Sequence, residues 1–378
     1  MNGFTIRRRD PLSSALYFGL GGIFLVGGII NFADIGWLTP LLEPFMVLLA
    51  VLSLHSARVP RSKIFLAMFL LLYILAGVVL AVVIRKANFL DFFQAYKSFW
   101  YLLLLIPISG ARFLSESDIV RLNRFLLTLF LVIYSVKKFF LEIDRPIVLT
   151  ENNFELLLVC MVFYLACLAR DRIHIGEMLA LGAIVFISGS RSSALCFAIV
   201  IAFLLVRGRL RRRDLLAIGG LVAAVIMGGI LFQLRAGAGG VENIDRVRFF
   251  FVFTEAISDW HWWNYLFGEP RITALPQWAC NQLSAYRGLF SYRNDGTCYS
   301  VILHSFNMRV IYDHGVVGLL FIVGAMWRMM DHVPSRVRLC FIVLLIANGL
   351  SVSAINSVYF ALGLVLAVGR RVGADDES

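Results

Sequence analysis

Four arginines and a histidine are the residues of this sequence best suited to chemistry. Arg191 stands in the serine-rich run SGSRSS, between two apolar segments. Arg246 and Arg248 follow in a more polar stretch, and His304 and Arg309 border another apolar segment. A guanidinium binds phosphate through two parallel hydrogen bonds, and an imidazole can accept a proton near neutral pH. These side chains predict a site that binds a phosphate-bearing substrate and activates a hydroxyl group.

The composition places these residues in a membrane protein. Of the 378 residues, 60% are apolar and 16% are charged, whereas about a quarter are charged in an average soluble domain. No internal repeat or low-complexity tract divides the chain. We therefore expect one polytopic membrane domain over residues 1–378.

Apolar segments long enough to cross a bilayer recur along the chain. A transmembrane helix needs about 20 residues, and about 17 is a practical minimum. Allowing for shorter segments, we expect an all-α integral membrane protein with about twelve transmembrane helices. They cover residues 11–33, 41–57, 64–84, 94–110, 125–141, 153–169, 177–190, 191–206, 215–234, 308–327, 339–354 and 355–369.

The positions of Lys and Arg orient these helices. If the amino terminus is cytoplasmic, most of the 35 Lys and Arg residues fall in loops on the cytoplasmic side, as the positive-inside rule requires. These loops lie at 7–9, 58–63, 112–124, 170–172, 207–213, 328–338 and 370–371. Both termini are then cytoplasmic, and one large loop, 235–307, lies outside between helices 9 and 10.

Two adjacent segments, 177–190 and 191–206, are too short for ordinary crossings, because two crossings need about 40 residues. A single long helix would fit the length, but it would put the basic run 207–213 outside. We therefore predict two short helices that meet at the SGSRSS turn, recessed below the outer surface. Irregular backbone at this depth must line a cavity, and a helix amino terminus favours anions. Arg191 and Ser190 are thus candidate phosphate ligands, and a snorkelling Arg191 at the lipid headgroups is the alternative.

The outer loop carries a second group of candidates. It contains several arginines and no lysine, and planar bidentate recognition of phosphate requires arginine. These arginines are Arg235, Arg246, Arg248, Arg271, Arg287 and Arg293. The aromatic run DWHWWNYLFG (259–268) fits a helix at the membrane interface, where Trp and Tyr concentrate. Stacking of these rings against sugars is the alternative.

Cysteine usage agrees with this topology. Cys280 and Cys298 both lie in the outer loop, where an oxidising compartment would favour a disulfide that clips a segment with little core of its own. The cysteines in apolar segments are expected to be packing residues; they are Cys160, Cys167, Cys196 and Cys340. The sequence has no CxxC, HExxH or Walker-type motif, so we expect no metal, no cofactor and no nucleotide-driven pump. We also expect no nucleic-acid partner.

His304 stands just before the apolar segment 308–327. On a continuous helix, His304, Gly315 and Gly318 would share one face, and Asp313 would point the opposite way. The glycines would let a neighbouring helix approach closely. His304 could be a simple interface residue, but together with the arginines it makes a stronger case for a site that binds a phosphate-bearing lipid.

These features resemble the bacterial O-antigen polymerase and ligase superfamily. In that pattern an apolar span ends in a small-residue–Ser–Arg turn, here the SGSRSS that contains Arg191. A long periplasmic loop then opens with an Arg shortly before a helix that closes on a Gly, and Arg248 is the closest match, with Arg246 next. The loop ends in a His, an acidic residue and two glycines at fixed spacing: His304, Asp313, Gly315 and Gly318.

The resemblance covers about residues 177–327 and has two departures. The family usually has Asn directly after the His, and this chain has Ser305. The second Gly that usually follows the loop helix is replaced by Glu269 and Pro270.

The resemblance implies a glycosyltransferase of the bacterial inner membrane that acts on the periplasmic side. Its donor would be an undecaprenyl-diphosphate-linked glycan. Arg191 and Arg248 would bind the diphosphate, with Arg246 and Arg309 as further candidates, and His304 would orient or deprotonate the acceptor hydroxyl. Preorganised arginines stabilise the charge that develops on such a leaving group, so no metal is required.

Three functions stay open. A polymerase would join lipid-linked repeat units, and we favour it because the chain is short and departs from the family pattern. A ligase would transfer the glycan to lipid A-core or another acceptor. A transporter or flippase should show paired similar halves or charges deep in several spans, and neither is apparent. The expected partners are membrane lipid and, for a polymerase, a chain-length regulator protein.

Overall fold

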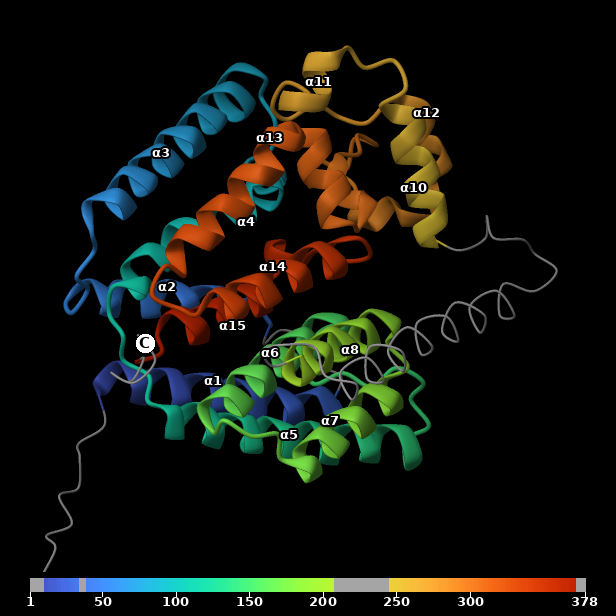
Figure 1. Cartoon of the computed structure of the whole chain (residues 1–378). Helices are drawn as coiled ribbons and strands as arrows, with labels where there is room; N and C mark the ends of the chain where they lie inside the picture. Colours follow the sequence, from blue (N-terminus) through green and yellow to red (C-terminus); the bar gives the residue numbers. More distant parts are fainter. Residues whose placement is uncertain (1–9, 34–38, 207–244, 372–378) are drawn as a thin grey trace, which may run out of the picture. The chain divides into compact units, whose positions relative to one another are not determined.

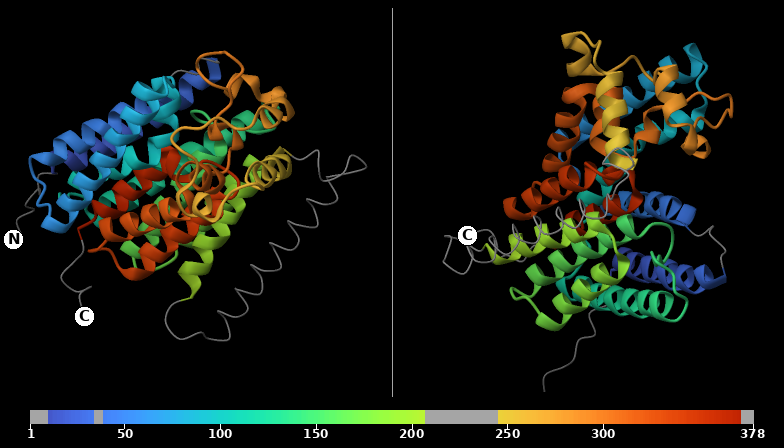
Figure 2. Two further views of the ribbon diagram at one scale, coloured as in Figure 1. Left: turned by 90° about the horizontal axis from the view of Figure 1, so that it is seen from above. Right: turned by 90° about the vertical axis from the view of Figure 1, so that its right-hand side faces the viewer.

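The computed structural model describes residues 10–33, 39–206 and 245–371. Over these residues the chain is all-helical, and Figures 1 and 2 show helices and connecting loops without a β-strand. The predicted all-α class is therefore confirmed for the described chain. The predicted span 215–234, the basic run 207–213 and Arg235 lie outside the described residues.

Five of the described helices are long and apolar enough to cross a membrane. They are α1 (Pro11–Ile30), α3 (Arg61–Val78) with its π-helical continuation η3 (Val79–Ile84), α5 (Glu116–Phe139), α6 (Asn152–Ala169) and α13 (Phe306–Met329). Shorter apolar helices are α2 (Leu42–Leu54), α7 (Ile175–Ser188), α8 (Arg191–Leu205) and α15 (Val358–Val368). Two further helices are α4 (Phe89–Ser109) and α14 (Ser335–Gly349). Together, the long and short helices overlap every predicted span except 215–234. Twelve crossings stay a prediction.

The chain divides into two compact units that alternate along the sequence. The first combines residues 1–60, 104–193 and 362–378, and the second combines 61–103 and 194–361. Helices α4, α8 and α15 belong partly to each unit, because the boundaries fall within them. The single membrane domain expected over the whole chain stays a prediction.

The first unit is organised around α6. Its side chains are buried on every face from Leu156 to Cys167, which is typical of a central core helix. Helix α5 packs against both α6 and α7, and α1 packs against α2 and α5. Helix α5 begins at an N-cap, Ser115, and carries acidic residues in its first turn and lysines in its last, so its ends complement the helix dipole.

The second unit contains residues 245–307, the described part of the predicted outer loop, and this part is more structured than the sequence suggested. Its elements are α10 (Asp245–Ala256), α11 (Trp262–Phe267), α12 (Gln277–Gln282), and the 3₁₀ helices η6 (Ser284–Leu289) and η7 (Ser300–Leu303). Buried side chains from α10, α12, η7 and α13 form one apolar cluster, which includes Phe249, Val252, Leu283, Ile302 and Tyr312. The expectation that this segment has little core of its own is therefore wrong.

Helix α13 is broken at Gly315, where the backbone takes φ 69° and ψ −176°. Only glycine adopts this conformation readily. The helix also begins at Phe306, so His304 precedes it. The prediction that His304, Gly315 and Gly318 share one face of a continuous helix is therefore wrong, because these residues do not belong to one unbroken helix.

The break at Gly315 is the docking point for α11. A Cβ at Gly315 would lie 2.1 Å from the carbonyl oxygen of Leu266, and one at Gly268 would lie 2.5 Å from the amide nitrogen of His314. The amide of Glu269 donates to the carbonyl of Tyr312 at 2.7 Å. Backbone therefore packs directly on backbone here. The expected close approach at Gly315 is confirmed, and its partner is the loop helix.

Hydrogen bonds and an ion pair join the other end of α13 to the start of α3. Lys63 is buried and donates to the carbonyl of Met329 at 3.1 Å and to Asp331 at 2.9 Å. Partial burial raises the pKa of Asp331, but hydrogen bonds from Lys63 and His332 outweigh it and leave that pKa below its usual value. The ion pair therefore holds a charged carboxylate at neutral pH.

Candidate functional site

The SGSRSS turn separates two short helices, as predicted. Helix α7 ends at Ser188, Gly189 follows in the left-handed conformation with φ 61°, and α8 begins at Arg191. A left-handed glycine is a common helix ending, because it lacks the Cβ that would clash. The turn therefore favours glycine at this position.

Asn153 of α6 organises the serines of this turn. Its side-chain oxygen accepts hydrogen bonds from the hydroxyls of Ser190 and Ser192. The Ser190 hydroxyl also caps α8 by accepting from the amide of Ser193 at 3.2 Å. Ser190 thus fixes the start of α8, and its role as a substrate ligand stays a prediction. In the sequence, the only indication that Asn153 takes part in this turn was its place in the polar run ENN, ahead of an apolar span.

Arg191 is exposed at the first position of α8. The amides at a helix amino terminus and the helix dipole favour an anion beside it. Arg191 belongs to the first unit, whereas Arg248 and His304 belong to the second. Their assembly into one site is therefore a prediction, and each group is described by itself.

His304 is held in an unusual backbone conformation between two anchored elements. It follows η7 with φ 55° and ψ −35°, a region that non-glycine residues rarely occupy. Its half-buried ring meets the rings of Phe249 and Tyr286 edge-on, with centroids 5.0 and 6.3 Å away. Positive φ at a non-glycine residue persists only where the surroundings enforce it, and it is enriched at functional sites.

Ser305 anchors the chain on one side of His304. Its hydroxyl caps α13 by accepting from the amide of Met308 at 3.3 Å, and it donates to the carbonyl of Gly349 at 2.8 Å. The amide of Phe306 donates to the carbonyl of Val352 at 3.0 Å. Ser and Asn are both preferred N-cap residues. Ser305, one departure from the family pattern, thus has a defined local role here.

Asp313 anchors the chain on the other side of His304. Its buried carboxylate accepts a hydrogen bond from the hydroxyl of Ser300, the first residue of η7. The acidic residue of the spaced motif therefore ties the 3₁₀ helix before His304 to α13. Arg309, one turn earlier on α13, is also buried and lies on the same side of the helix as Asp313.

Arg248 lies on the helix that packs against His304. It is exposed on α10, and its guanidinium donates to the carbonyl of Gln282 at the end of α12. The next residue, Phe249, supplies the ring that contacts His304. Arg246, also exposed, lies two residues earlier. The structure therefore brings α10 and His304 together around Phe249.

A third cluster, centred on His314, was not identified as functional from the sequence. The hydroxyl of Tyr73 lies 2.8 Å from Nδ1 of His314, and the guanidinium of Arg271 lies 4.2 Å above the Tyr73 ring. Tyr96 and Phe99 enclose the imidazole at 5.0 and 4.7 Å. This environment agrees with a packing role for His314 and places Arg271, from the outer loop, over the aromatic cluster.

A disulfide joins Cys280 to Cys298, with Cα atoms 5.7 Å apart. The bond links α12 to the segment before η7, where the amide of Leu275 also donates to the carbonyl of Cys298 at 2.9 Å. Both cysteines are buried in the loop core, so the cross-link supports the element that leads to His304.

The aromatic run of the loop divides into two sets. Tyr265 donates to the carbonyl of Ile257 at 3.0 Å, and the ring of Trp260 packs 5.7 Å from that of Tyr312. The outward-facing set is Trp262, Trp263 and Phe267, which are 73%, 58% and 58% exposed. The first set holds the loop together. The second set is the more exposed and can contact either the membrane interface or a sugar.

Within the described part of the chain, no group of three or more His, Cys, Asp or Glu side chains is placed to hold a metal ion.

Comparison of the sequence with protein-family models and with curated proteins finds no match. The resemblance to the polymerase and ligase superfamily therefore depends on the motifs themselves and on where the structure places them.

Proposed function

We propose that this protein polymerises undecaprenyl-diphosphate-linked oligosaccharide repeat units on the periplasmic face of the bacterial inner membrane. The observation that carries the proposal is the enforced conformation of His304. It lies between a 3₁₀ helix tied by Asp313 and a helix capped by Ser305, with α10 packed against its ring. Residues held in a strained backbone are enriched at functional sites, so this conformation favours a chemical role for His304.

In the proposed reaction, a hydroxyl of one repeat unit attacks the anomeric carbon of another lipid-linked glycan. The new glycosidic C–O bond forms while the bond between the anomeric carbon and the diphosphate oxygen breaks. His304 accepts the hydroxyl proton. Undecaprenyl diphosphate leaves with the electron pair, and the guanidinium groups of Arg191 and Arg248 stabilise its negative charge.

Two features of the structure support this division of roles. Arg248 is exposed on α10 while the adjacent Phe249 contacts His304, so a charged group can reach a substrate beside the imidazole. Arg191 is exposed where the amides of α8 begin, so it can add its charge to that of the helix terminus. Both arginines suit the diphosphate, and the half-buried imidazole suits the smaller hydroxyl.

The test is reconstitution of the purified full-length protein in proteoliposomes with a synthetic undecaprenyl-diphosphate-linked repeat unit. The proposal predicts a ladder of longer lipid-linked glycans that forms in the presence of EDTA. Transfer to added lipid A-core without elongation would instead identify a ligase. Movement of the substrate across the bilayer without any new glycosidic bond would identify a transporter. Either result would refute the polymerase.

A further inference from the structure

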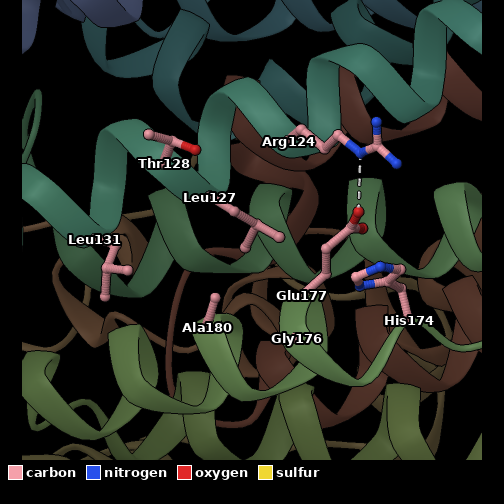
Figure 3. Close-up of a pocket in the computed structure, with 8 residues that line it drawn as sticks. All are labelled: Arg124, Leu127, Thr128, Leu131, His174, Gly176, Glu177 and Ala180. Carbon is pink, nitrogen blue, oxygen red and sulfur yellow. Dashed lines mark hydrogen bonds and ion pairs between the residues drawn. The ribbon is translucent and has the colours of Figure 1, made fainter.

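A groove in the first unit lies between α5 and α7. It encloses a volume of about 170 Å³, and its lining includes Arg124, Leu127, Leu131, His174 and Ala180. Figure 3 shows Arg124 and His174 gathered around Glu177 at one end of the groove, with Leu131 towards the other. The groove is therefore charged at one end and mainly apolar along its length, where Thr128 adds a single hydroxyl.

The polar end carries a net positive charge. The Glu177 carboxylate accepts from Arg124 Nε at 3.1 Å, from Arg170 at 2.8 Å and from Asn123 at 2.7 Å. Two guanidinium groups thus face one carboxylate, which has its hydrogen-bonding capacity met. Arg124 donates to Glu177 only through its Nε, and its side chain is 60% exposed. Its outer nitrogens can bind an anion.

The amino end of α7 adds to this preference. Helix α7 starts at Ile175, directly after His174, and Gly176 lines the groove. The first amides of a helix have no partner within it, and the helix dipole there favours negative charge. An exposed guanidinium, a helix terminus and a histidine therefore lie at the same end of the groove, with the paired carboxylate of Glu177 between Arg124 and His174.

The apolar part of the groove follows the direction in which α5 would cross the membrane. Arg124, Leu127 and Leu131 occupy one face of α5, and the distance from Arg124 to Leu131 along the helix is about 10 Å. The neighbouring side chains Val132 and Leu179 are 57% and 63% exposed. The loops at 112–124 and 170–172 are expected in the cytoplasm. The charged end then lies at the headgroups of the inner leaflet, and the apolar walls lie among the acyl chains.

We propose that this groove binds an anionic glycerophospholipid of the cytoplasmic leaflet. The phosphate would contact Arg124, His174 and the amino end of α7, and one acyl chain would lie along Leu131 and Ala180. Basic grooves between membrane helices on the cytoplasmic side suit such headgroups. A soluble phosphate would use only the polar end, which does not account for the apolar walls.

Native mass spectrometry of the full-length protein in detergent tests this site, with phosphatidylglycerol as the probe. Phosphatidylglycerol should bind better than phosphatidylethanolamine. Arg124→Gln should weaken its binding about fivefold, equivalent to about 1 kcal/mol. Ala180→Phe should weaken it similarly, because the ring fills the acyl-chain channel. The matched control is Arg121→Gln, one turn earlier on α5, where the arginine is 44% exposed and pairs with Asp118; it should bind as the wild type does.

Three results would overturn the proposal. The first is unchanged phosphatidylglycerol binding in Arg124→Gln, which leaves Glu177 paired with Arg170 and is expected to fold. The second is equal binding of phosphatidylethanolamine by the wild type. The third is displacement of the lipid by glycerol 1-phosphate at comparable concentration, which would show that the groove recognises a free phosphate only.

Discussion

Replacing Gly315 by alanine should destabilise the protein through a single backbone contact. The φ of 69° with ψ of −176° lies in a region that other residues enter at a strain of about 1 to 3 kcal/mol. The added Cβ would also stand 2.1 Å from the carbonyl oxygen of Leu266, and overpacking of this kind adds about 1 to 3 kcal/mol. We therefore expect Gly315→Ala to lose about 2 kcal/mol or more.

The matched control is Gly324→Ala in the same helix. Gly324 is exposed, helical and has no atom within 4 Å of an added Cβ. Alanine there should be neutral or stabilise the helix by up to about 1 kcal/mol. The assay is thermal unfolding of both purified variants in the same detergent, followed by tryptophan fluorescence. A midpoint for Gly315→Ala equal to or above that of Gly324→Ala would refute the docking of α11 on the break in α13.

Three further predictions concern the elements around His304 and the far end of α13. Ser300→Ala should reduce polymer formation by loosening η7, whereas the protein level in the membrane should stay normal on an immunoblot; full activity would show that this tie does not position His304. Alkylation of unreduced, denatured protein followed by mass spectrometry should find no free thiol at Cys280 or Cys298, and labelling of both would exclude the disulfide. Asp331→Asn should lower the thermal midpoint most near neutral pH. Because the pKa of Asp331 is lowered in the folded state, its contribution should fade as the pH falls through that pKa, and a difference that is constant from pH 7 to pH 3 would contradict the ion pair.

Hydropathy and charge predicted the helices well because the bilayer imposes a simple rule on the sequence. A span must be apolar and helical, so its position can be read from composition alone. The break between α7 and α8 was predictable for a related reason. The two segments are short, and a single long helix would have put the basic run 207–213 outside, against the positive-inside rule.

The local geometry around His304 could not be predicted in this way. The assumption of one continuous helix failed because nothing in the spacing of His304 and Gly315 indicates that the helix starts after the first and breaks at the second. A glycine within an apolar helix is equally compatible with close helix packing and with a break. Only the contact of Gly315 with Leu266, far away in the sequence, decides between them.

Hydrogen bonds between residues distant in sequence were also beyond prediction. Asn153 of α6 accepts a hydrogen bond from Ser190 of the SGSRSS turn, and Asp313 of α13 accepts one from Ser300 of η7. Short polar side chains near span ends are common and have many acceptable partners. Their positions showed that the segments were polar, but their partners depend on tertiary packing.

The most direct test of the central claim is complementation of a deletion strain with Arg191→Lys, Arg248→Lys and His304→Ala, read by polysaccharide gel beside an immunoblot. Lysine keeps the charge but loses the planar fork, and loss of one donor to developing charge costs about 2.7 to 4 kcal/mol, or about 100- to 1,000-fold in rate. Each variant should therefore lack visible polymer at normal protein level, whereas His314→Ala, within the aromatic cluster, should act mainly on packing and lower the protein level instead. Full-length polymer from Arg191→Lys and His304→Ala at normal protein level would contradict the account and leave both residues with structural roles.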